Sequence, residues 1–326
     1  MKIAILDDYQ DVFRTLKCYP RLKGHDVAVY HDSVKEPAKL AERLKGTDAV
    51  VFLQQRTPFP RAAAERATTL KVISQTGRNV GHIDVEACTE KGIVVCGSGA
   101  GQVNHTAELT WGLILSVLRH IPEEVQRLKA GRWQTTIGTT VVGKTLGVYA
   151  YGRIGSLVAK VGRAFEMKVI CWGREGSTAK ARADGFEIAP SREAFFEHSD
   201  VVSLHIPLNK ETRGIVKHAD LARMKPTALI VTTSRGPIIE EGALVRALKE
   251  GRPGYGAVDV FDDEPVLNGN HPPAQDGQRG VHAAHRVRDT GRVRASVFGH
   301  LRPDRCLCRR RADQCGEPGR RGLTLV

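Results

Sequence analysis

The sequence predicts an α/β protein with two domains, each built on a parallel β-sheet covered by helices. The chain has 326 residues, which is enough for two domains of ordinary size. Short apolar runs alternate with helix-like segments through the first hundred residues, and a second such alternation begins near residue 144. Because strand, helix and strand in succession produce parallel strand pairs, this pattern favours doubly wound sheets.

Each expected element follows from its own apolar pattern. The first hundred residues predict strands at 2–8, 25–32, 70–77 and 92–98, and a helix leading into a buried strand at 40–54. Residues 105–130 predict one long helix, or two helices with a break near Pro122. Further on we expect a strand, a Gly-rich turn, a helix and a second strand at 144–175, then buried strands at 199–208, 228–236 and 254–261.

The composition indicates a globular protein. Hydrophobic residues make up 41% of the chain and charged residues 26%, as in soluble proteins. No run of about 18 apolar residues occurs, and the N-terminus lacks the apolar region of a secretory signal. The seven scattered cysteines form no C-x-x-C pair, which argues against a disulfide framework or a zinc site. We therefore expect a cytoplasmic protein with no membrane segment and no metal.

The positive charge of the chain is concentrated at its end. Residues 271–326 contain 12 Arg, no Lys and 5 acidic residues, so this tail supplies +7 of the net charge of +13. A strongly basic protein often binds nucleic acid or another polyanion. The first 270 residues carry only about +6, which does not indicate such a partner.

A glycine-containing turn follows the strand that includes Leu146. The usual dinucleotide fingerprint is G-x-G-x-x-G between a strand and a helix, and here the motif is A-Y-G-R-I-G with Ala150 first. The glycines allow close approach of the backbone to a pyrophosphate, and the free N–H groups of the helix attract its charge. The tight turn must form with the Cβ of Ala150 present. The cofactor-binding residues expected in this turn are Tyr151, Gly152, Arg153, Ile154 and Gly155.

The end of the second strand bears on the choice of cofactor. A carboxylate that binds the ribose is expected about 20 residues after the turn, and this position is Gly173, followed by Arg174. A missing carboxylate beside an Arg suits the 2′-phosphate of NADP. Two alternatives stay open: Arg174 is a solvated loop residue, or Glu175 serves as the ribose acid.

Further segments of the chain resemble a single family. ETRGIV and ADLARMKPTALIVTTSRGPIIEEGALVRAL lie within 211–248, and VSLHIPL and AVDVFDDEP flank them at 202–208 and 257–265. TGRNVGHID at 76–84 and HTAELT at 105–110 resemble a substrate loop and the start of a hinge helix. Over residues 1–271 the chain is similar to the D-isomer-specific 2-hydroxyacid dehydrogenases.

This resemblance implies a domain arrangement. A Rossmann nucleotide domain at 99–283 is inserted into a smaller, flavodoxin-like substrate domain whose first part spans 1–98. Residues 284–326 stand where the returning segment of the substrate domain is expected. The resemblance also implies a homodimer built largely on the nucleotide domains, and an active site beyond the carboxyl ends of the strands.

The family resemblance assigns roles to individual residues. Hydride passes between the nicotinamide of NAD(P)H and the carbon that bears the oxygen of a small 2-oxo or 2-hydroxy acid. Arg235, in S-R-G, matches the catalytic Arg, since a guanidinium can bind a carboxylate with two parallel hydrogen bonds. Glu264 matches the carboxylate that pairs with the acid/base His. Asn79 and Val80 resemble the loop whose backbone holds the substrate carboxylate. Further cofactor contacts are expected from Thr106, His205, Pro207, Thr212, Thr233 and Asp259.

The tail departs from the family pattern. About 20 residues after Glu264-Pro265 the family has T-P-H-I/L-G, whereas this chain has HPPAQDGQRGVHAAHRVRDTGRVR. Written as degenerate codons and displaced by one nucleotide, this stretch permits H-P-L-L-K-M-D-N-V-V-C-T-P-H-I-G-Y. Residues 311–319 permit A-P-I-N-V-V-N-P in the same frame. We therefore hypothesise a one-nucleotide frameshift at about codons 272–273, which would remove the catalytic His and leave only His285 or His282 nearby.

Several functions remain open at this point. The first is a 2-oxo acid reductase acting on glyoxylate, hydroxypyruvate or a 3-phosphoglycerate-like acid, because the specificity loops near 52–58 and 99–105 have no decodable charge pattern. The second is a nucleotide-sensing interaction protein, and the third is a catalytically dead protein that only binds dinucleotide. The Arg-rich tail, with Arg309-Arg310-Arg311, is alternatively a nucleic-acid arm.

Overall fold

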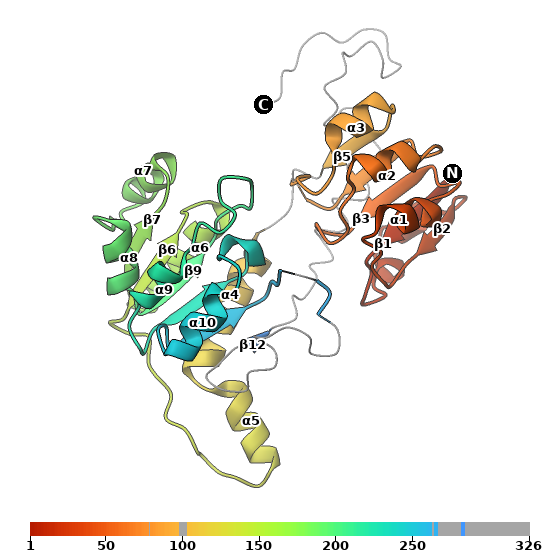
Figure 1. Ribbon diagram of the computed structural model, residues 1–326. Coiled ribbons are helices and arrows are strands. Elements are labelled where there is room, and N and C mark those ends of the chain that lie inside the picture. The colour runs from red at the N-terminus through yellow and green to blue at the C-terminus, as the bar shows by residue number, and fades with distance from the viewer. Residues whose placement is uncertain (78, 98–102, 263, 267–281, 284–326) are drawn as a thin grey trace. The chain divides into compact units, whose positions relative to one another are not determined.

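The structure divides into two compact units. It is a computed structural model that describes residues 1–77, 79–97, 103–262, 264–266 and 282–283. The N-terminal unit falls within Met1–Gln102 and the central unit within Val103–Val287 (Figure 1). The predictions for His285 and for the tail lie outside the described residues. Each unit is described by itself.

A parallel five-stranded sheet forms the N-terminal unit, in the order β2-β1-β3-β4-β5. This order is that of flavodoxin-like folds. The strands are β1 (Lys2–Leu6), β2 (Asp26–Val29), β3 (Ala49–Phe52), β4 (Val72–Gln75) and β5 (Val94–Gly97). The helices are η1 (Phe13–Thr15), η2 (Tyr19–Leu22), α1 (Pro37–Arg43), α2 (Arg61–Arg66) and α3 (Val85–Glu90). All five predicted strands of this region are confirmed.

Both faces of this sheet are buried, as is usual for parallel strands. Successive side chains of β1 point to opposite faces, so that Ala4 and Leu6 pack in one core and Ile3 and Ile5 in the other. Residues of α1, α2 and α3 complete the first core, and residues of η1 and η2 complete the second. The sheet therefore presents only its ends and edges to a ligand.

The central unit contains a seven-stranded parallel sheet in the order β12-β11-β10-β9-β6-β7-β8. The strand order reverses at β6, which pairs with β7 on one side and with β9 on the other. This is the Rossmann arrangement, in which ligands bind at the carboxyl ends beside the reversal. The strands are β6 (Thr145–Tyr149), β7 (Lys168–Trp172), β8 (Glu187–Ile188), β9 (Val201–Leu204), β10 (Leu229–Thr232), β11 (Tyr255–Val258) and β12 (His282–Ala283).

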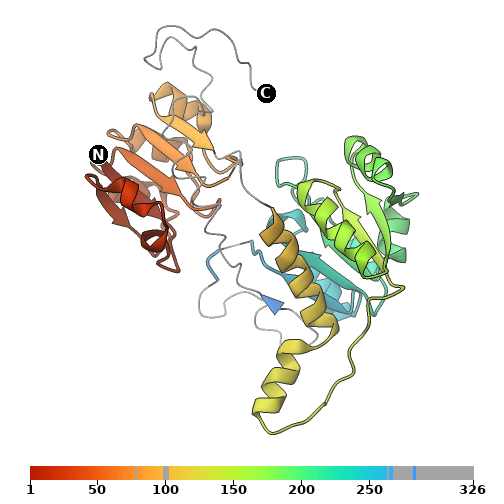
Figure 2. The ribbon, with the colours of Figure 1, turned by 180° about the vertical axis from the view of Figure 1, so that it is seen from behind.

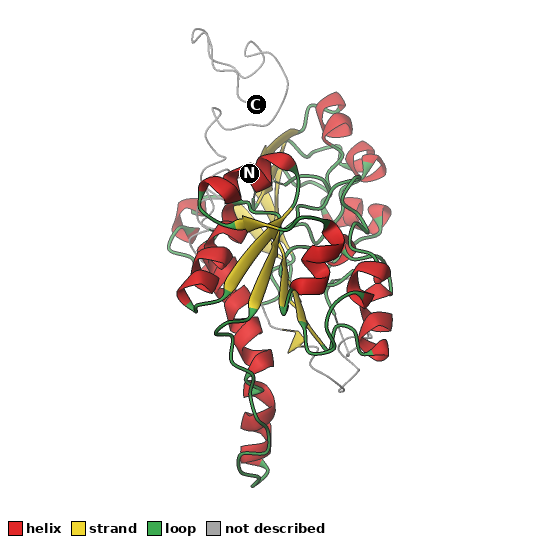
Figure 3. Cartoon of the chain, turned by 90° about the vertical axis from the view of Figure 1, so that its left-hand side faces the viewer, coloured by secondary structure: helices red, strands yellow, loops and turns green. Residues whose placement is uncertain are grey.

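Helices cover both faces of the central sheet (Figure 3). Trp111 and Ile114 of α4 and Val158 of α6 pack in one core, whereas Phe196 of α8 and Leu221 of α9 pack in the other. The helices are α4 (Asn104–Leu118), α5 (Ile121–Lys129), α6 (Arg153–Ala164), α7 (Glu175–Ala183), α8 (Arg192–His198), α9 (His218–Ala222), α10 (Ala243–Glu250) and η3 (Gly236–Ile238). Among the described residues, none of these helices has the length and apolarity that crossing a bilayer requires.

The helical region predicted at 105–130 consists of two helices. The alternative with a break near Pro122 is confirmed, because α4 ends at Leu118 and α5 begins at Ile121. His120, between them, has a left-handed backbone with φ of 54°. Figure 2 shows α5 and the chain that follows it extending away from the sheet of the central unit.

Candidate functional site

The turn after β6 adopts the conformation that a dinucleotide loop needs. Ala150 has φ of 73°, so a residue with a Cβ takes the left-handed conformation that usually requires glycine. The N–H of Ala150 donates to the carbonyl oxygen of Trp172 at 2.8 Å, which ties the turn to β7. Gly152 then caps α6 with extended backbone and without a side-chain cap. The expectation that the turn forms despite the Cβ of Ala150 is confirmed.

The space around the two glycines fits a bound pyrophosphate. A Cβ on Gly155 would lie 2.5 Å from the carbonyl oxygen of Ala150, so no larger residue allows α6 to begin this close to the turn. A Cβ on Gly152 would meet no heavy atom within 4 Å, so its outer side is open. Gly152 offers no side-chain cap to the first N–H groups of α6, which lie at the positive end of the helix dipole. A nicotinamide dinucleotide would be held here by backbone of Gly152, Arg153 and Ile154.

Tyr151 contributes its backbone to the turn and its side chain to the core. The ring is buried against Phe186, and the hydroxyl donates to Oδ2 of Asp184 at 2.6 Å. Burial, followed by the Asp184 carboxylate, raises the pKa of this phenol. The side chain therefore anchors the turn to the C-terminal end of α7, and only the backbone of Tyr151 is placed to meet a cofactor.

A hydroxyl lies at the position where the ribose acid was expected. The N–H of Tyr151 donates to Oγ of Ser177, on the first turn of α7, at 2.6 Å. Gly173 has φ of 155°, and Arg174 caps α7 with a side chain that is 72% exposed. Nη1 of Arg174 is 4.0 Å from Oε2 of Glu211. The sequence interpretation missed Ser177, because the dinucleotide fingerprint assigns no role to a residue four positions after Gly173.

The ends of β9 and β10 place further predicted cofactor residues near the turn. His205 continues the ladder beyond β9, since its N–H donates to the carbonyl oxygen of Tyr149 at 3.0 Å. Nε2 of His205 is 2.8 Å from Oγ of Ser203, and the buried Nδ1 has no hydrogen-bond partner among the described residues. Burial lowers the pKa of His205 to about 4, so the ring is neutral at pH 7. A neutral ring with an open nitrogen can contact a nicotinamide or ribose.

Three of the predicted cofactor residues are buried threonines: Thr106, Thr212 and Thr233. Oγ1 of Thr233 is 3.0 Å from Oγ1 of Thr110, whose own hydroxyl donates to the carbonyl oxygen of Thr106 at 2.8 Å. The hydroxyl of Thr212 donates to the carbonyl oxygen of Pro207 at 2.6 Å and closes the loop after β9. The structure thus links the start of α4 to the end of β10, and Thr212 to Pro207.

The predicted catalytic residues Arg235 and Glu264 and the predicted cofactor residue Asp259 follow neighbouring strands at one edge of the sheet. Arg235 follows β10 and Asp259 follows β11, and these neighbouring strands pair in register through Thr232 and Val258. Nη1 of Arg235 donates to the carbonyl oxygen of Ser234 at 2.6 Å. Oε1 of Glu264 accepts from the N–H of Phe261 at 3.0 Å, which holds the carboxylate against the loop after β11. The expected pairing of Glu264 with a His concerns residues outside those described.

In the N-terminal unit, the predicted substrate loop forms a turn after β4. Oδ1 of Asn79 accepts from the N–H of Gly81 at 2.9 Å, and the carbonyl oxygen of Val80 accepts from the N–H of Ile83 at 2.8 Å. The side chain of Asn79 therefore shapes the turn. The binding of a carboxylate by the N–H groups of Asn79 and Val80 stays a prediction.

A polar cluster that the sequence interpretation missed closes the carboxyl end of β1. Asp7 is buried with φ of 62°, and its carboxylate accepts from Oγ of Ser33 and from Oγ1 of Thr57, each at 2.8 Å. Nη1 of Arg56 donates to the carbonyl oxygen of Asp7 at 3.0 Å, and the guanidinium lies 4.5 Å from the ring centre of Tyr9. Burial raises the pKa of Asp7 and raises that of Tyr9 to about 12. Arg56 is thus a fixed cation in the expected specificity loop.

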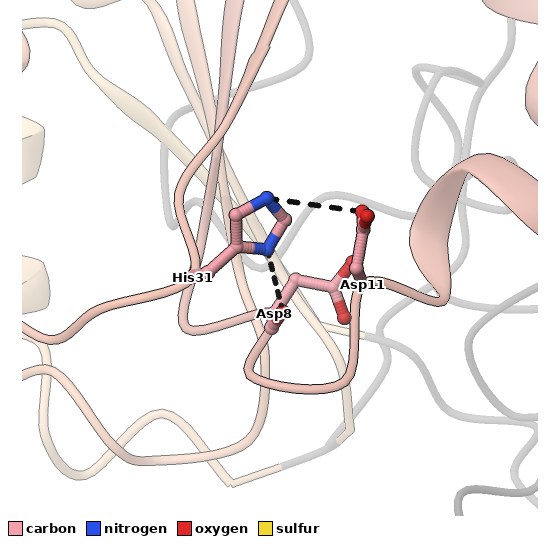
Figure 4. A group of neighbouring side chains, drawn as sticks. All are labelled: Asp8, Asp11 and His31. Atoms are coloured by element: carbon pink, nitrogen blue, oxygen red, sulfur yellow. Dashed lines mark hydrogen bonds and ion pairs between the residues drawn. The ribbon is translucent and has the colours of Figure 1, made fainter.

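Asp8, Asp11 and His31 offer metal-ligand atoms that lie within 4.8 Å of one another (Figure 4). Nδ1 of His31 is 2.9 Å from the carbonyl oxygen of Asp8, and Nε2 is 3.8 Å from Oδ1 of Asp11. The carboxylate of Asp8 accepts from the N–H of Phe13 at 2.8 Å. These contacts hold the loop after β1 against the end of β2, so we assign the cluster to loop structure.

Comparisons with known proteins identify the family. Residues 111–281 match the NAD binding domain of the D-isomer specific 2-hydroxyacid dehydrogenases. The chain belongs to this family. It is 38% identical to a glyoxylate reductase of Aeropyrum pernix over 277 residues, which cover 80% of this chain and 82% of that protein. It is 40% identical to a D-3-phosphoglycerate dehydrogenase of Methanocaldococcus jannaschii over 268 residues, 81% of this chain but only half the length of that relative.

Solved structures agree with this family assignment. The crystal structure of a phosphoglycerate oxidoreductase from Vibrio cholerae o395 is 43% identical, covers 87% of this chain and 91% of that one, and superposes with a TM-score of 0.82. The family match at 111–281 contains the turn of Ala150 to Gly155, Arg235 and Asp259. The family resemblance and the Rossmann fold expected from the sequence are both confirmed.

Proposed function

We propose that this protein is an oxidoreductase that transfers a hydride between NAD(P)H and a small 2-oxo or D-2-hydroxy acid. The observation that carries the proposal is the placement of Arg235. In a member of the D-2-hydroxyacid dehydrogenase family, this guanidinium follows β10 at the carboxyl edge of the sheet that bears the dinucleotide turn. A cation there binds a planar carboxylate and polarises the adjacent carbonyl.

The roles of the residues follow from their chemistry. The bound nicotinamide supplies the hydride chemistry, while the protein must bind the acid, polarise its carbonyl and move one proton. Arg235 holds the substrate carboxylate and its carbonyl oxygen, and the N–H groups of Asn79 and Val80 hold the carboxylate. Glu264 is held by the N–H of Phe261, and a carboxylate at this place raises the pKa of an imidazole beside it.

The proposed substrates are anionic 2-oxo acids such as glyoxylate, hydroxypyruvate or a 3-phosphoglycerate-like acid. The relatives named glyoxylate reductase and D-3-phosphoglycerate dehydrogenase support this class. The fixed guanidinium of Arg56 supplies a further cation at the carboxyl end of the N-terminal sheet. An assay of each acid with NADH and with NADPH tests the proposal, and the absence of turnover with all of them in a frame-restored protein would overturn it.

For the cofactor, we propose that NADPH binds at least as well as NADH. Gly173 leaves no carboxylate to repel a 2′-phosphate, and the exposed guanidinium of Arg174 can attract one. Dissociation constants of both dinucleotides, measured by quenching of tryptophan fluorescence, test this choice. A tenfold preference for NADH would remove it, and failure to bind either dinucleotide would remove the proposed function as a whole.

We propose that the chain as written is impaired, because its tail lacks the acid/base His that the displaced frame would restore. The second candidate function is therefore a dinucleotide-binding or interaction protein without catalysis, favoured by a tail that departs from the family after about residue 272. Binding of dinucleotide without turnover, both before and after the frame is restored, would support this candidate over the enzyme.

A homodimer is proposed on the basis of exposed apolar side chains around α5. Ile121, Val125 and Leu128 are each about half exposed along one side of the helix, and Trp133 and Ile137 are 74% and 94% exposed. The segment after α5 is held against its polar side, as Oε1 of Glu124 accepts from the hydroxyls of Thr135 and Thr136. A second copy would cover these apolar groups. Sedimentation of the wild type and of a Trp133→Glu, Ile137→Glu variant should show a dimer and a monomer respectively, whereas a wild-type monomer contradicts the proposal.

A further inference from the structure

We propose that Ser177 takes the place of the missing ribose acid and determines which dinucleotide the protein prefers. This inference rests on the proposed dinucleotide function and concerns the 2′ position of the adenosine ribose. Ser177 is on the first turn of α7, four residues beyond Gly173, where β7 has ended. Its hydroxyl would face the ribose and favour a 2′-phosphate.

The position of the hydroxyl is fixed by a hydrogen bond with the turn. The N–H of Tyr151, inside the dinucleotide turn, donates to Oγ of Ser177 at 2.6 Å. A Cβ built on Gly173 would lie only 3.2 Å from the same oxygen. Oγ of Ser177 therefore occupies the space that a side chain at position 173 would enter, directly beside the dinucleotide turn.

The chemistry of a hydroxyl differs from that of a carboxylate at this place. A carboxylate only accepts hydrogen bonds, so it binds a free 2′-hydroxyl and repels a 2′-phosphate. Oγ of Ser177 already accepts the N–H of Tyr151, and its own proton is left to donate. A neutral donor beside the exposed guanidinium of Arg174 suits the oxygens of a 2′-phosphate.

The backbone conformation at position 173 disfavours any side chain there, including a carboxylate. Gly173 has φ of 155°, which residues with a Cβ rarely adopt, and its Cβ would also lie 3.4 Å from Cα of Ala150. An acid at position 177 meets no such strain, because it stands in the first turn of α7, where negative charge is favourable. The preference for a dinucleotide is therefore set from α7 and can be changed there.

The experiment uses nucleotide fragments, so that catalysis does not enter the readout. The full chain and its variants are titrated by calorimetry with 2′,5′-ADP and with 5′-AMP, and then with NADPH and NADH. Ser177→Asp should lower the affinity for 2′,5′-ADP relative to 5′-AMP by about tenfold or more, since one charged hydrogen bond becomes a repulsion. Ser177→Thr keeps the hydroxyl and should keep the wild-type ratio. Ala179→Asp places the same charge at an exposed position of α7 and is the matched control.

Each outcome supports or overturns the role of Ser177. A changed ratio in Ser177→Asp and an unchanged ratio in Ala179→Asp and Ser177→Thr support it. Equal effects of the two Asp variants would mean that only the charge of the helix matters, and would overturn it. Equal weakening of all four nucleotides by Ser177→Ala would assign the hydroxyl to loop structure alone. If the wild type binds both dinucleotides and the Ser177 variants leave their affinities unchanged, only the role of Ser177 fails. If neither dinucleotide binds, the proposed function fails.

Discussion

The carboxyl ends of the two sheets differ in the parts beside β6 and beside β1. In the central unit the edge beside β6 consists of backbone, with open space beside Gly152 and with α6 beginning close to the turn at Gly155. In the N-terminal unit the edge beside β1 is filled with polar side chains, among them Asp7, Arg56 and Thr57, that bind one another. The edge beside β6 can bind a phosphate through backbone alone, whereas the edge beside β1 contains the charged guanidinium of Arg56, held in place by Asp7.

This difference fits the ligands that we propose for the protein. A pyrophosphate is common to all dinucleotides, so backbone N–H groups at a helix N-terminus bind it without regard to the rest of the ligand. A small acid must be recognised by its few charges, and this requires a guanidinium held in one orientation. The buried carboxylate of Asp7 binds Ser33 and Thr57, while the backbone of Asp7 orients Arg56.

The largest expected effect comes from restoring the reading frame at codons 272–273. Dinucleotide affinity should stay the same, because the turn, Arg174 and Ser177 precede the tail. The value of kcat/KM for 2-oxo acids should rise about 10²–10⁴-fold, since a general acid/base returns beside Glu264. Steady-state kinetics of both proteins measure the change. Equal activity would mean that the tail as written is functional, and His282 and His285 would then have to be tested.

A smaller loss is expected from Arg235→Lys in the active protein. A lysine offers a point charge and cannot form two parallel hydrogen bonds, and one lost charged bond costs about 1.5–3 kcal/mol, or roughly 10–100-fold in kcat/KM. The dissociation constant of the dinucleotide should not change. Arg246→Lys, at an exposed position of α10, is the control. An unaltered kcat/KM in the Arg235 variant would assign this residue to the surface.

The two edges also differ in how far the sequence predicts them. The turn at Ala150 to Gly155 was recognised because steric limits restrict its residue types, and a Cβ at Gly155 would meet the Ala150 carbonyl. The longer strands were predicted for the same kind of reason, since parallel strands buried on both faces are apolar throughout, whereas the two-residue strands β8 and β12 were not predicted. Ala150 stands in the place of the first glycine of this motif, and its positive φ is the conformation by which the turn forms with a Cβ present.

The cluster at Asp7 could not be predicted in this way. Asp7, Ser33 and Arg56 are far apart in the sequence, and any polar residues at the ends of β1, β2 and β3 would give the same pattern. Ser177 was missed for a related reason, because its contact with Tyr151 depends on how α7 begins after Gly173. Side-chain networks between loops are set by tertiary structure, which local patterns do not contain.

The side-chain edge predicts a dependence of stability on pH. Burial raises the pKa of Asp7, so the folded state holds this proton more tightly than the unfolded state. The stability that Asp7 contributes is therefore full below its ordinary pKa of about 3.9 and is lost as the pH rises through the raised value. Asp7→Asn removes this titration, so the free energy of unfolding of the variant minus that of the wild type should increase from pH 4 to pH 7.

Urea denaturation at several pH values measures this difference. Asp11→Asn is the matched control, because Asp11 is exposed and also has a positive φ, of 48°. If the unfolding free energy of Asp7→Asn minus that of the wild type stays constant or falls as the pH rises, Asp7 is not a buried acid with a raised pKa. The two edges would then not differ in this electrostatic property.

The smallest expected effect concerns the backbone edge. Ala150 has φ of 73°, a conformation that costs a residue with a Cβ about 1–2 kcal/mol, and glycine avoids this cost. Glycine in turn loses about 0.4–1 kcal/mol through its greater freedom in the unfolded chain. Ala150→Gly should therefore stabilise the central unit by up to about 1.5 kcal/mol, measured as a higher Tm, with dinucleotide affinity equal or better. Ala159→Gly makes the same change inside α6, where it is buried and helical, and should destabilise. A lower Tm for Ala150→Gly would mean that the Cβ of Ala150 contributes packing that outweighs its backbone strain, and the turn could not then be regarded as built from backbone alone.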